Sequence, residues 1–111
     1  MDNIERYREI ARRIITAHTE MASPRNDIQY QTIFDQPNDR YILMLQGWDG
    51  RRRIHACIIH IDIIGGKFWI QHDGTDYGVA NELFNAGVPK DHIVLGFKSP
   101  QLRRYTEFAA A

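Results

Sequence analysis

The hydrophobic and polar positions at the start of the chain follow a helical period. Across residues 4–22, apolar side chains recur at spacings of three or four and form one stripe. The stripe consists of Ile4, Tyr7, Ala11, Ile14, Ile15, His18 and Met21. Asp2 or Asn3 can cap the first turn, and Ser23-Pro24 stops the helix because proline disfavours helical backbone in the preceding residue. The pattern predicts one long N-terminal helix with one buried face.

Between residues 27 and 73 the period changes to two, which is typical of half-buried strands. The alternating runs are residues 27–35, 41–48, 53–64 and 67–73. The turn sequences between them are Pro37-Asn38-Asp39, Asp49-Gly50 and Gly65-Gly66. Because each connection is short, these runs predict a four-stranded antiparallel meander.

The two-residue turns at Asp49-Gly50 and Gly65-Gly66 are typical of type I′ hairpins, which fix the register of the strands that they join. The pairs expected around the first turn are Leu45 with Ile54, Leu43 with Ala56 and Tyr41 with Ile58. Those expected around the second are Ile63 with Phe68, Ile61 with Ile70, Asp62 with Trp69 and His60 with Gln71.

This register divides the side chains of the sheet between two faces. The face expected under the N-terminal helix carries Ile42, Met44, Cys57, Ile59, Ile61, Ile63, Phe68 and Ile70. The opposite face carries Tyr41, Leu43, Leu45, Ile54, Ala56 and Ile58, then His60, Asp62, Trp69 and Gln71. A solvated sheet face is normally polar. The half-apolar second face therefore predicts a cover, from the C-terminal third of the chain or from a second molecule.

After the fourth strand the helical period returns. The stretch WIQHDGTDYG indicates a strand end, a tight turn and a helix start, in which Asp73 or Thr75 can accept backbone N–H groups. Residues 76–87 predict a second helix. Thr75 or Asp76 can cap it, and Gly87 can end it in a left-handed conformation.

The remaining segment predicts three short features. Residues 92–97 form a fifth strand, and Ser99-Pro100 starts a short helix that runs to Arg104. Tyr105 and Phe108 are the expected anchors of the tail. Together the elements predict an α+β fold: a four- to five-stranded, mainly antiparallel sheet with a long N-terminal helix and a C-terminal helical segment.

Composition limits the classes of function. Residues 1–111 predict one domain, with the 43% hydrophobic and 25% charged content of a globular protein. Acidic and basic residues balance at 14 each, which argues against bulk attraction to nucleic acid or membranes and makes self-association easier. The one cysteine, Cys57, fits a reducing compartment. Without a membrane-length apolar run or a signal peptide, we expect a cytoplasmic protein.

Metal-binding residue types occur without a convergent pattern. His60 and Asp62 share a strand face, but the expected register places His72 on the other face, which breaks a four-ligand cluster. We therefore assign no metal, cofactor or catalytic residue. A hydrolase or metal-dependent enzyme around His60, Asp62 and Asp73 stays as an alternative.

Nucleophilic and phosphate chemistry find little support. Cys57 and His55 lie on the expected core face, away from an exposed activating base. The glycines around Thr75 match no phosphate-binding loop. Arg51-Arg52-Arg53 form a basic hairpin tip that could contact DNA phosphates, although a solvated tip also fits the neutral total charge.

Taken together, several segments resemble the XisI family, the fdxN element excision controlling factors of cyanobacteria. The segments are ERYREI, GWDGRRRIHACIIHIDI, GKFWIQHDGTDYGVANEL, GVPKDHIVLGF and the tail from Pro100 to Ala109. The resemblance spans essentially the whole chain, and one departure is Asp76, where the family more often has glutamate. It implies a role in controlling excision of a DNA element during heterocyst differentiation, with strand exchange done by a separate recombinase. It also implies an XisH-like, nuclease-like companion protein, and it brings no set of catalytic residues.

Our leading hypothesis is a non-enzymatic accessory protein that acts by protein–protein contact. Its candidate interaction surface comprises Trp69, Gln71, Asp73, Thr75, Arg103, Arg104 and Tyr105. The expected partners are the XisH-like companion and, through the half-apolar sheet face, a second copy in a homodimer. We expect DNA contact to be indirect at most and no membrane partner. The alternative is a DNA-binding module that uses Arg51, Arg52, Arg53, Arg103 and Arg104.

Overall fold

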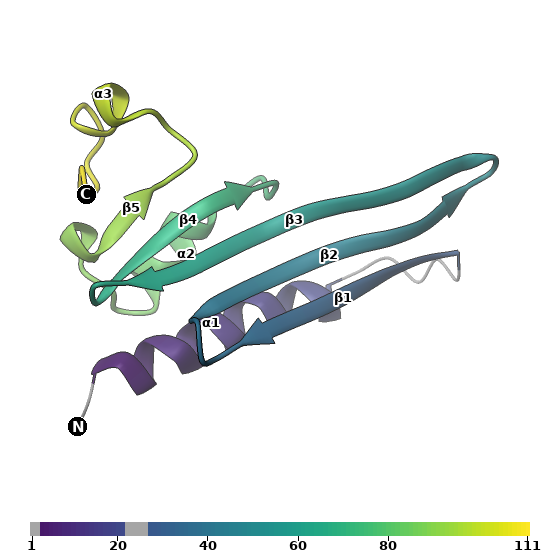
Figure 1. The fold of residues 1–111 in the computed structure, drawn as a ribbon, viewed down its shortest axis with the longest axis horizontal. Helices are drawn as coiled ribbons and strands as arrows, with labels where there is room; N and C mark the ends of the chain where they lie inside the picture. Colours follow the sequence, from purple (N-terminus) through teal and green to yellow (C-terminus); the bar gives the residue numbers. More distant parts are fainter. Residues whose placement is uncertain (1–2, 22–26) are drawn as a thin grey trace.

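The computed structural model describes residues 3–21 and 27–111 (Figure 1). The helices are α1 (Asn3–Glu20), α2 (Val79–Asn85), α3 (Pro100–Arg103) and the 3-10 helix η1 (Lys90–His92). The strands are β1 (Ile28–Asp35), β2 (Arg40–Asp49), β3 (Arg52–Ile64), β4 (Lys67–Asp73) and β5 (Ile93–Leu95). None of the described helices is long and apolar enough to cross a membrane.

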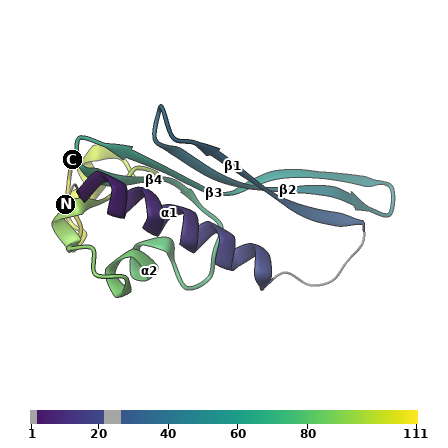
Figure 2. The same cartoon turned by 90° about the horizontal axis from the view of Figure 1, so that it is seen from below.

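The strands form one sheet in the order β1-β2-β3-β4-β5. The first four are antiparallel neighbours, and β5 runs parallel to β4. Both α1 and α2 lie against the same face (Figure 2), which we call the helix face; the other is the outer face. The hairpin of β2 and β3 projects well beyond the helices. The structure confirms the predicted α+β class.

Helix α1 buries most of the predicted stripe. Tyr7, Ala11, Ile14 and Ile15 are buried, together with Ile10, which the stripe had omitted. The prediction for Met21 is wrong: its side chain is 79% exposed because the helix ends at Glu20 and the stripe does not continue. The predicted roles of Asp2 and Ser23-Pro24 lie outside the described residues.

Asp39, in the turn between β1 and β2, ties that turn to the helix. Arg8 Nε of α1 donates to Asp39 Oδ1 at 2.7 Å, and the Tyr41 hydroxyl donates to the same oxygen at 3.2 Å. The hydrogen bond to Asp39 raises the pKa of the Arg8 guanidinium above its usual value. The ion pair thereby fixes one end of β2 over α1.

The predicted register of β2 and β3 is wrong in two ways. The loop residues are Gly50 and Arg51, since Asp49 pairs with Arg52. Within the loop only Gly50 has positive φ, at 62°, so the turn is not type I′. In place of the three expected pairs, the structure pairs Leu45 with Ala56, Leu43 with Ile59 and Tyr41 with Ile61.

A β-bulge at Ile58 causes the second error, because it adds one residue to β3. As a result, β2 and the part of β3 before Ile58 have their two faces exchanged relative to the prediction. Tyr41 and Leu43, expected on the second face, are completely buried on the helix face. The residues expected in the core instead, Ile42, Met44 and Cys57, are half-buried on the outer face. The predicted half-apolar second face is therefore divided differently between the two faces.

The hairpin of β3 and β4 agrees with its prediction up to a second bulge. Gly65 and Gly66 have φ values of 59° and 78°, as a type I′ turn requires. Three of the four predicted pairs are present, and they are Ile63 with Phe68, Asp62 with Trp69 and Ile61 with Ile70. The fourth is wrong, because a bulge at Gln71 pairs His60 with His72. The bulge also brings Asp73 opposite the buried Ile59.

The C-terminal third contains the predicted helices and a shortened β5. Gly87 ends α2 with a φ of 99°, and the Val88 N–H donates to the Leu83 carbonyl oxygen at 3.1 Å. Pro100 occupies the first turn of α3, as predicted. Phe108 packs against the core, but Tyr105 is 77% exposed, so its predicted anchoring role is wrong.

Candidate interaction surface

Arg103 fastens the C-terminal segment to the outer face of the sheet. Its Nε donates to the carbonyl oxygens of Lys98 at 3.0 Å and Leu95 at 3.3 Å. Its guanidinium carbon lies 5.0 Å from the centroid of the Trp69 ring, a cation–π distance. Arg103 and Trp69 contact each other and form the base of the surface. Because its guanidinium already binds carbonyl groups and the ring, Arg103 is not a free cation that could bind a phosphate or a carboxylate.

A carboxylate network adjoins this base on the outer face. Asp62 Oδ1 accepts a hydrogen bond from His60 Nε2 at 2.9 Å, and Asp62 Oδ2 accepts one from Gln71 Nε2 at 3.2 Å. The predicted common face of His60 and Asp62 is confirmed. The network occupies both oxygens of Asp62 and positions Gln71 beside Trp69 along β4.

The side chains that the C-terminal segment presents to solvent are large. Phe97 is 49%, Leu102 is 55% and Tyr105 is 77% exposed. Arg104 stacks its guanidinium carbon 5.2 Å from the Tyr105 ring centroid. We call these four residues the C-terminal patch. Tyrosine and arginine are the residue types that most often dominate binding energy at protein interfaces.

Asp73 and Thr75 belong to a different environment. Asp73 Oδ1 accepts the Thr75 N–H at 2.9 Å, and Asp73 Oδ2 accepts the Val79 N–H at 2.7 Å. The Thr75 hydroxyl accepts the Gly78 N–H at 3.2 Å. These bonds confirm the prediction that Asp73 or Thr75 satisfies backbone donors. Both side chains hold the start of α2 on the helix face. The predicted cap by Asp76 is wrong, because this side chain is exposed and the N-cap residue of α2 is Gly78.

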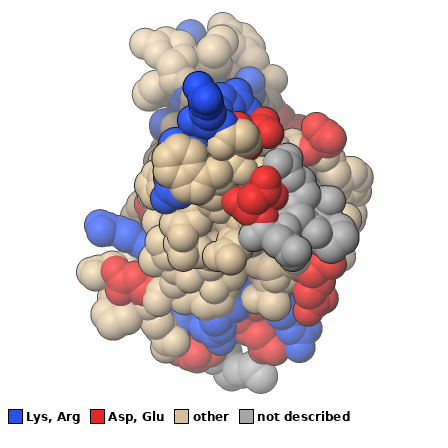
Figure 3. All heavy atoms as spheres, turned by 90° about the vertical axis from the view of Figure 1, so that its right-hand side faces the viewer, with Lys and Arg blue, Asp and Glu red and all other residues tan. Residues whose placement is uncertain are grey.

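The basic hairpin tip lies far from the C-terminal segment (Figure 1). Arg51, Arg52 and Arg53 are all exposed. Arg53 stacks on Trp48 at 5.2 Å, and Arg52 lies 3.7 Å from Asp49. Figure 3, which looks at this end of the molecule, shows basic atoms gathered on the tip with carboxylates beside them. The structure therefore does not bring the tip together with the arginines of α3.

The described residues contain no group of three or more His, Cys, Asp or Glu side chains placed to hold a metal ion. His60 and His72 are cross-strand neighbours, so the predicted placement of His72 on the face opposite His60 is wrong. Cys57 lies on the outer face with His55, and not in the core. Burial raises the pKa of the Cys57 thiol, which disfavours the nucleophilic thiolate.

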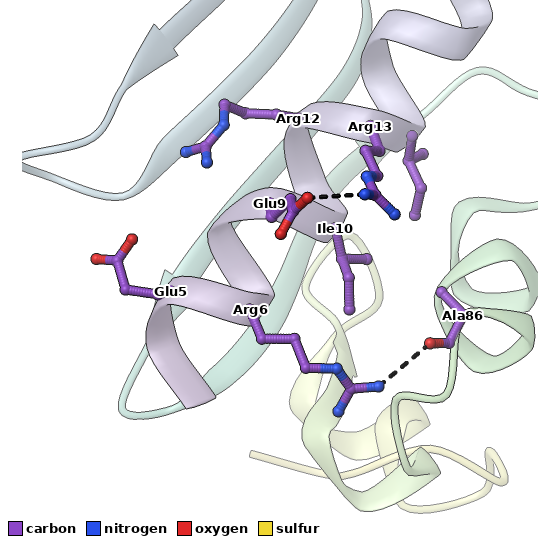
Figure 4. Close-up of a pocket in the computed structure, with 8 residues that line it drawn as sticks. Glu5, Arg6, Glu9, Ile10, Arg12, Arg13 and Ala86 are labelled. Carbon is purple, nitrogen blue, oxygen red and sulfur yellow. Dashed lines mark hydrogen bonds and ion pairs between the residues drawn. The ribbon is translucent and has the colours of Figure 1, made fainter. Parts of the chain in front are cut away.

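One concave surface was not predicted. It has a volume of about 610 Å³ and lies between the exposed side of α1 and the end of α2 (Figure 4). Arg6 donates to the Ala86 carbonyl oxygen at 3.4 Å, and Arg13 pairs with Glu9 at 2.8 Å. The lining side chains carry charges of both signs, as on a solvated helix. The sequence did not predict the hollow, because it forms where two helices that are distant in the sequence meet.

The family model and the solved structures that match this chain agree with each other. The model of the family described as XisI protein matches residues 1–110. The crystal structure of a XisI-like protein from Anabaena variabilis has 37% identity and a TM-score of 0.92, over 97% of this chain and 99% of that one. The fdxN element excision controlling factor XisI from Anabaena variabilis has 34% identity and a TM-score of 0.87, over 99% and 100%. A search of curated proteins finds no match. The chain belongs to the XisI family.

Proposed function

We propose that this chain is a non-enzymatic controlling factor for excision of a DNA element such as the fdxN element, and that it acts by contact with another protein. The partner that the family resemblance implies is an XisH-like, nuclease-like companion. Similarity over nearly the full length to an excision controlling factor supports the role. The C-terminal patch supports the mode of action.

The patch carries the proposal because it combines exposure with rigidity. Arg103 binds three carbonyl groups and the Trp69 ring, so the segment is held in place before any partner arrives. A segment that is already held in place loses less conformational entropy on binding, and a tyrosine side chain has few rotatable bonds to immobilise. An exposed Tyr105 on a fixed segment is therefore well suited to fill a pocket on another protein.

The described polar groups are better suited to support than to reaction. Asp62 is occupied by His60 and Gln71, and Asp73 by the backbone of α2. Burial raises the pKa of the Cys57 thiol, which disfavours the thiolate that a nucleophilic cysteine needs. These contacts favour an accessory role over catalysis by the same residues.

Removing the Tyr105 side chain from the C-terminal patch is expected to weaken binding of the companion protein. Tyr105→Ala should lower the affinity for the co-expressed XisH-like protein roughly 30-fold, which corresponds to about 2 kcal/mol for an interface hot spot. Because Tyr105 is 77% exposed, its removal should leave the free energy of unfolding nearly unchanged. Titration calorimetry on the purified pair measures the affinity, and circular dichroism checks the fold.

The matched control is Tyr77→Ala. Tyr77 is 60% exposed in the connection before α2, a helix that lies on the helix face of the sheet (Figure 2). Binding should be unchanged in this variant. Equal affinity of all three proteins, or no complex under native conditions, would contradict the proposal.

A second candidate function, nucleic-acid binding, rests on the projecting hairpin. A two-stranded ribbon can enter a DNA groove, and three exposed arginines at its tip can contact phosphates. Arg103 does not contribute to this candidate, since its guanidinium is engaged by carbonyl groups. The contact would be local, because the total charge of the chain is zero.

This candidate predicts a salt-dependent affinity for duplex DNA. If the three tip arginines each contact a phosphate, log K should fall with log salt at a slope of roughly −3. Arg52→Ala should reduce that slope by about one, whereas Arg104→Ala should leave it unchanged. Fluorescence anisotropy over a salt series measures both. Absence of binding at low salt would eliminate the candidate.

A further inference from the structure

Strand β1 forms an edge of the sheet without the usual protection. Among the described residues, no strand pairs with its outer side. Its sequence, IQYQTIFD, contains no lysine, arginine or proline, the residues that commonly block an edge. Gln31 and Thr32 are exposed, and Ile33 and Phe34 are 46% and 38% exposed. An open edge of this kind can accept another strand.

The backbone groups on this edge can be assigned from the neighbouring pair. The Trp48 N–H donates to the Asp27 carbonyl oxygen at 2.9 Å, just before β1 begins. In an antiparallel ladder alternate residues bond to the same neighbour. The odd-numbered residues of β1 therefore bond to β2. The even-numbered residues direct their N–H and C=O groups outward, and these are Ile28, Tyr30, Thr32 and Phe34.

We propose that a second copy of this chain pairs its own β1 with this edge, antiparallel and around a two-fold axis at Thr32. The axis is perpendicular to the sheet, so both copies place α1 on the same side. The two sheets become one continuous sheet, and each outward backbone group of Tyr30, Thr32 and Phe34 finds a partner. A second copy fits because an antiparallel edge is complementary to itself.

Charge and overlap select Thr32 as the centre. A two-fold axis perpendicular to the sheet pairs residues of the same face, so the centre must be a single residue. Centring on Gln31 would oppose Asp35 to Asp27 of the other copy, and like charges directly opposite are unfavourable. Centring on Ile33 would shorten the paired span. Thr32 avoids both, because Asp35 then faces Gln29 of the second copy.

The side chains in this register gain burial. Tyr30 faces Phe34 of the second copy twice, and aromatic cross-strand pairs are favourable. Gln31 faces Ile33 of the second copy on the outer face. The zero net charge of the chain offers no general repulsion to the second copy. The proposed homodimer uses the edge of the sheet, and leaves the C-terminal patch at the opposite edge free for another protein.

Cysteine cross-linking tests the register in the intact chain, with Cys57→Ser as background. Thr32→Cys places two sulfurs directly opposite at the axis, within the range of a disulfide. Mild oxidation should therefore give a covalent dimer on a non-reducing gel. Gln29→Cys is the matched control: Gln29 is also exposed, but in the proposed register the two substituted residues lie far apart on opposite sides of the axis. Equal cross-linking of both variants, or none of Thr32→Cys, would overturn the proposal.

Light scattering tests the same register without a covalent bond. The wild type should show about twice the monomer mass. Thr32→Lys opposes two lysines and should weaken the dimer roughly tenfold or more. Gln29→Lys faces Asp35 of the second copy and should keep or strengthen it. A monomeric wild type, or a dimer that Thr32→Lys leaves intact while circular dichroism shows normal folding, would overturn the proposal.

Discussion

Replacing Leu43 by alanine is expected to lower the free energy of unfolding by about 3 kcal/mol, the range found for fully buried leucines. Its side chain is completely buried on the helix face, where it lies opposite Ile59. Alanine would lose the packing of the leucine side chain in the core and leave a cavity between the sheet and the helices. Urea unfolding with a two-state fit measures the loss, and the m-value checks that the unfolded state is unchanged.

The adjacent substitution, Ile42→Ala, is the matched control for this result. Ile42 is half-buried on the outer face, so its truncation should lower the free energy of unfolding by only about 1 kcal/mol. Regular alternation around an Asp49-Gly50 turn predicts the reverse order, with Ile42 in the core. A larger loss for Ile42→Ala than for Leu43→Ala would contradict the bulge at Ile58. Both proteins are compared at one concentration, so that dimerisation does not alter the comparison.

Local patterns predicted the elements because each element leaves a signal within a few residues. The helical stripe gave α1, and alternation gave the four long strands. Gly65-Gly66 gave both the turn and the nearest pairs, since only glycine readily supplies two successive positive φ values. Gly87 and Pro100 marked a helix end and a helix start for comparable backbone reasons.

The two bulges could not be predicted because each occurs where neighbouring residues are alike. Ile58 and Ile59 are both apolar, so an extra residue between the faces produces no visible conflict with the hydrophobic pattern. Gln71 and His72 are both polar and hide the second bulge in the same way. A pair of like residues within an alternating strand is therefore the position where a predicted register is least secure.

The same bulges explain why the candidate surface was only partly recognised. Regular alternation places Trp69, Gln71 and Asp73 on one face, but the bulge at Gln71 separates Asp73 from the other two. The stacking of Arg103 on Trp69 depends on the path of the chain between β5 and α3, which no local pattern records. Exposure of Tyr105 follows from the same path.

The second large effect is expected at Gly47, where β2 passes the start of β1. Gly47 has a φ of 154°, and a Cβ there would lie 2.0 Å from the Asp27 carbonyl oxygen and 2.7 Å from the Ile28 Cα. These contacts are with backbone, which cannot rotate away as a side chain can. Gly47→Ala is therefore expected to lower the free energy of unfolding by about 3 kcal/mol or more. Urea unfolding measures the loss.

Gly50→Ala separates the steric contact from the backbone preference. Gly50 also has positive φ, at 62°, but a Cβ there meets no heavy atom within 4 Å. Its replacement should therefore lower the free energy of unfolding by only about 1 kcal/mol, the effect of left-handed backbone alone.

Hydrogen exchange should show faster exchange of β1 amides in Gly47→Ala alone. Because β1 is the proposed dimer edge, that variant should also be monomeric, whereas Gly50→Ala should dimerise. Equal losses of stability in the two variants would contradict the close approach at Gly47.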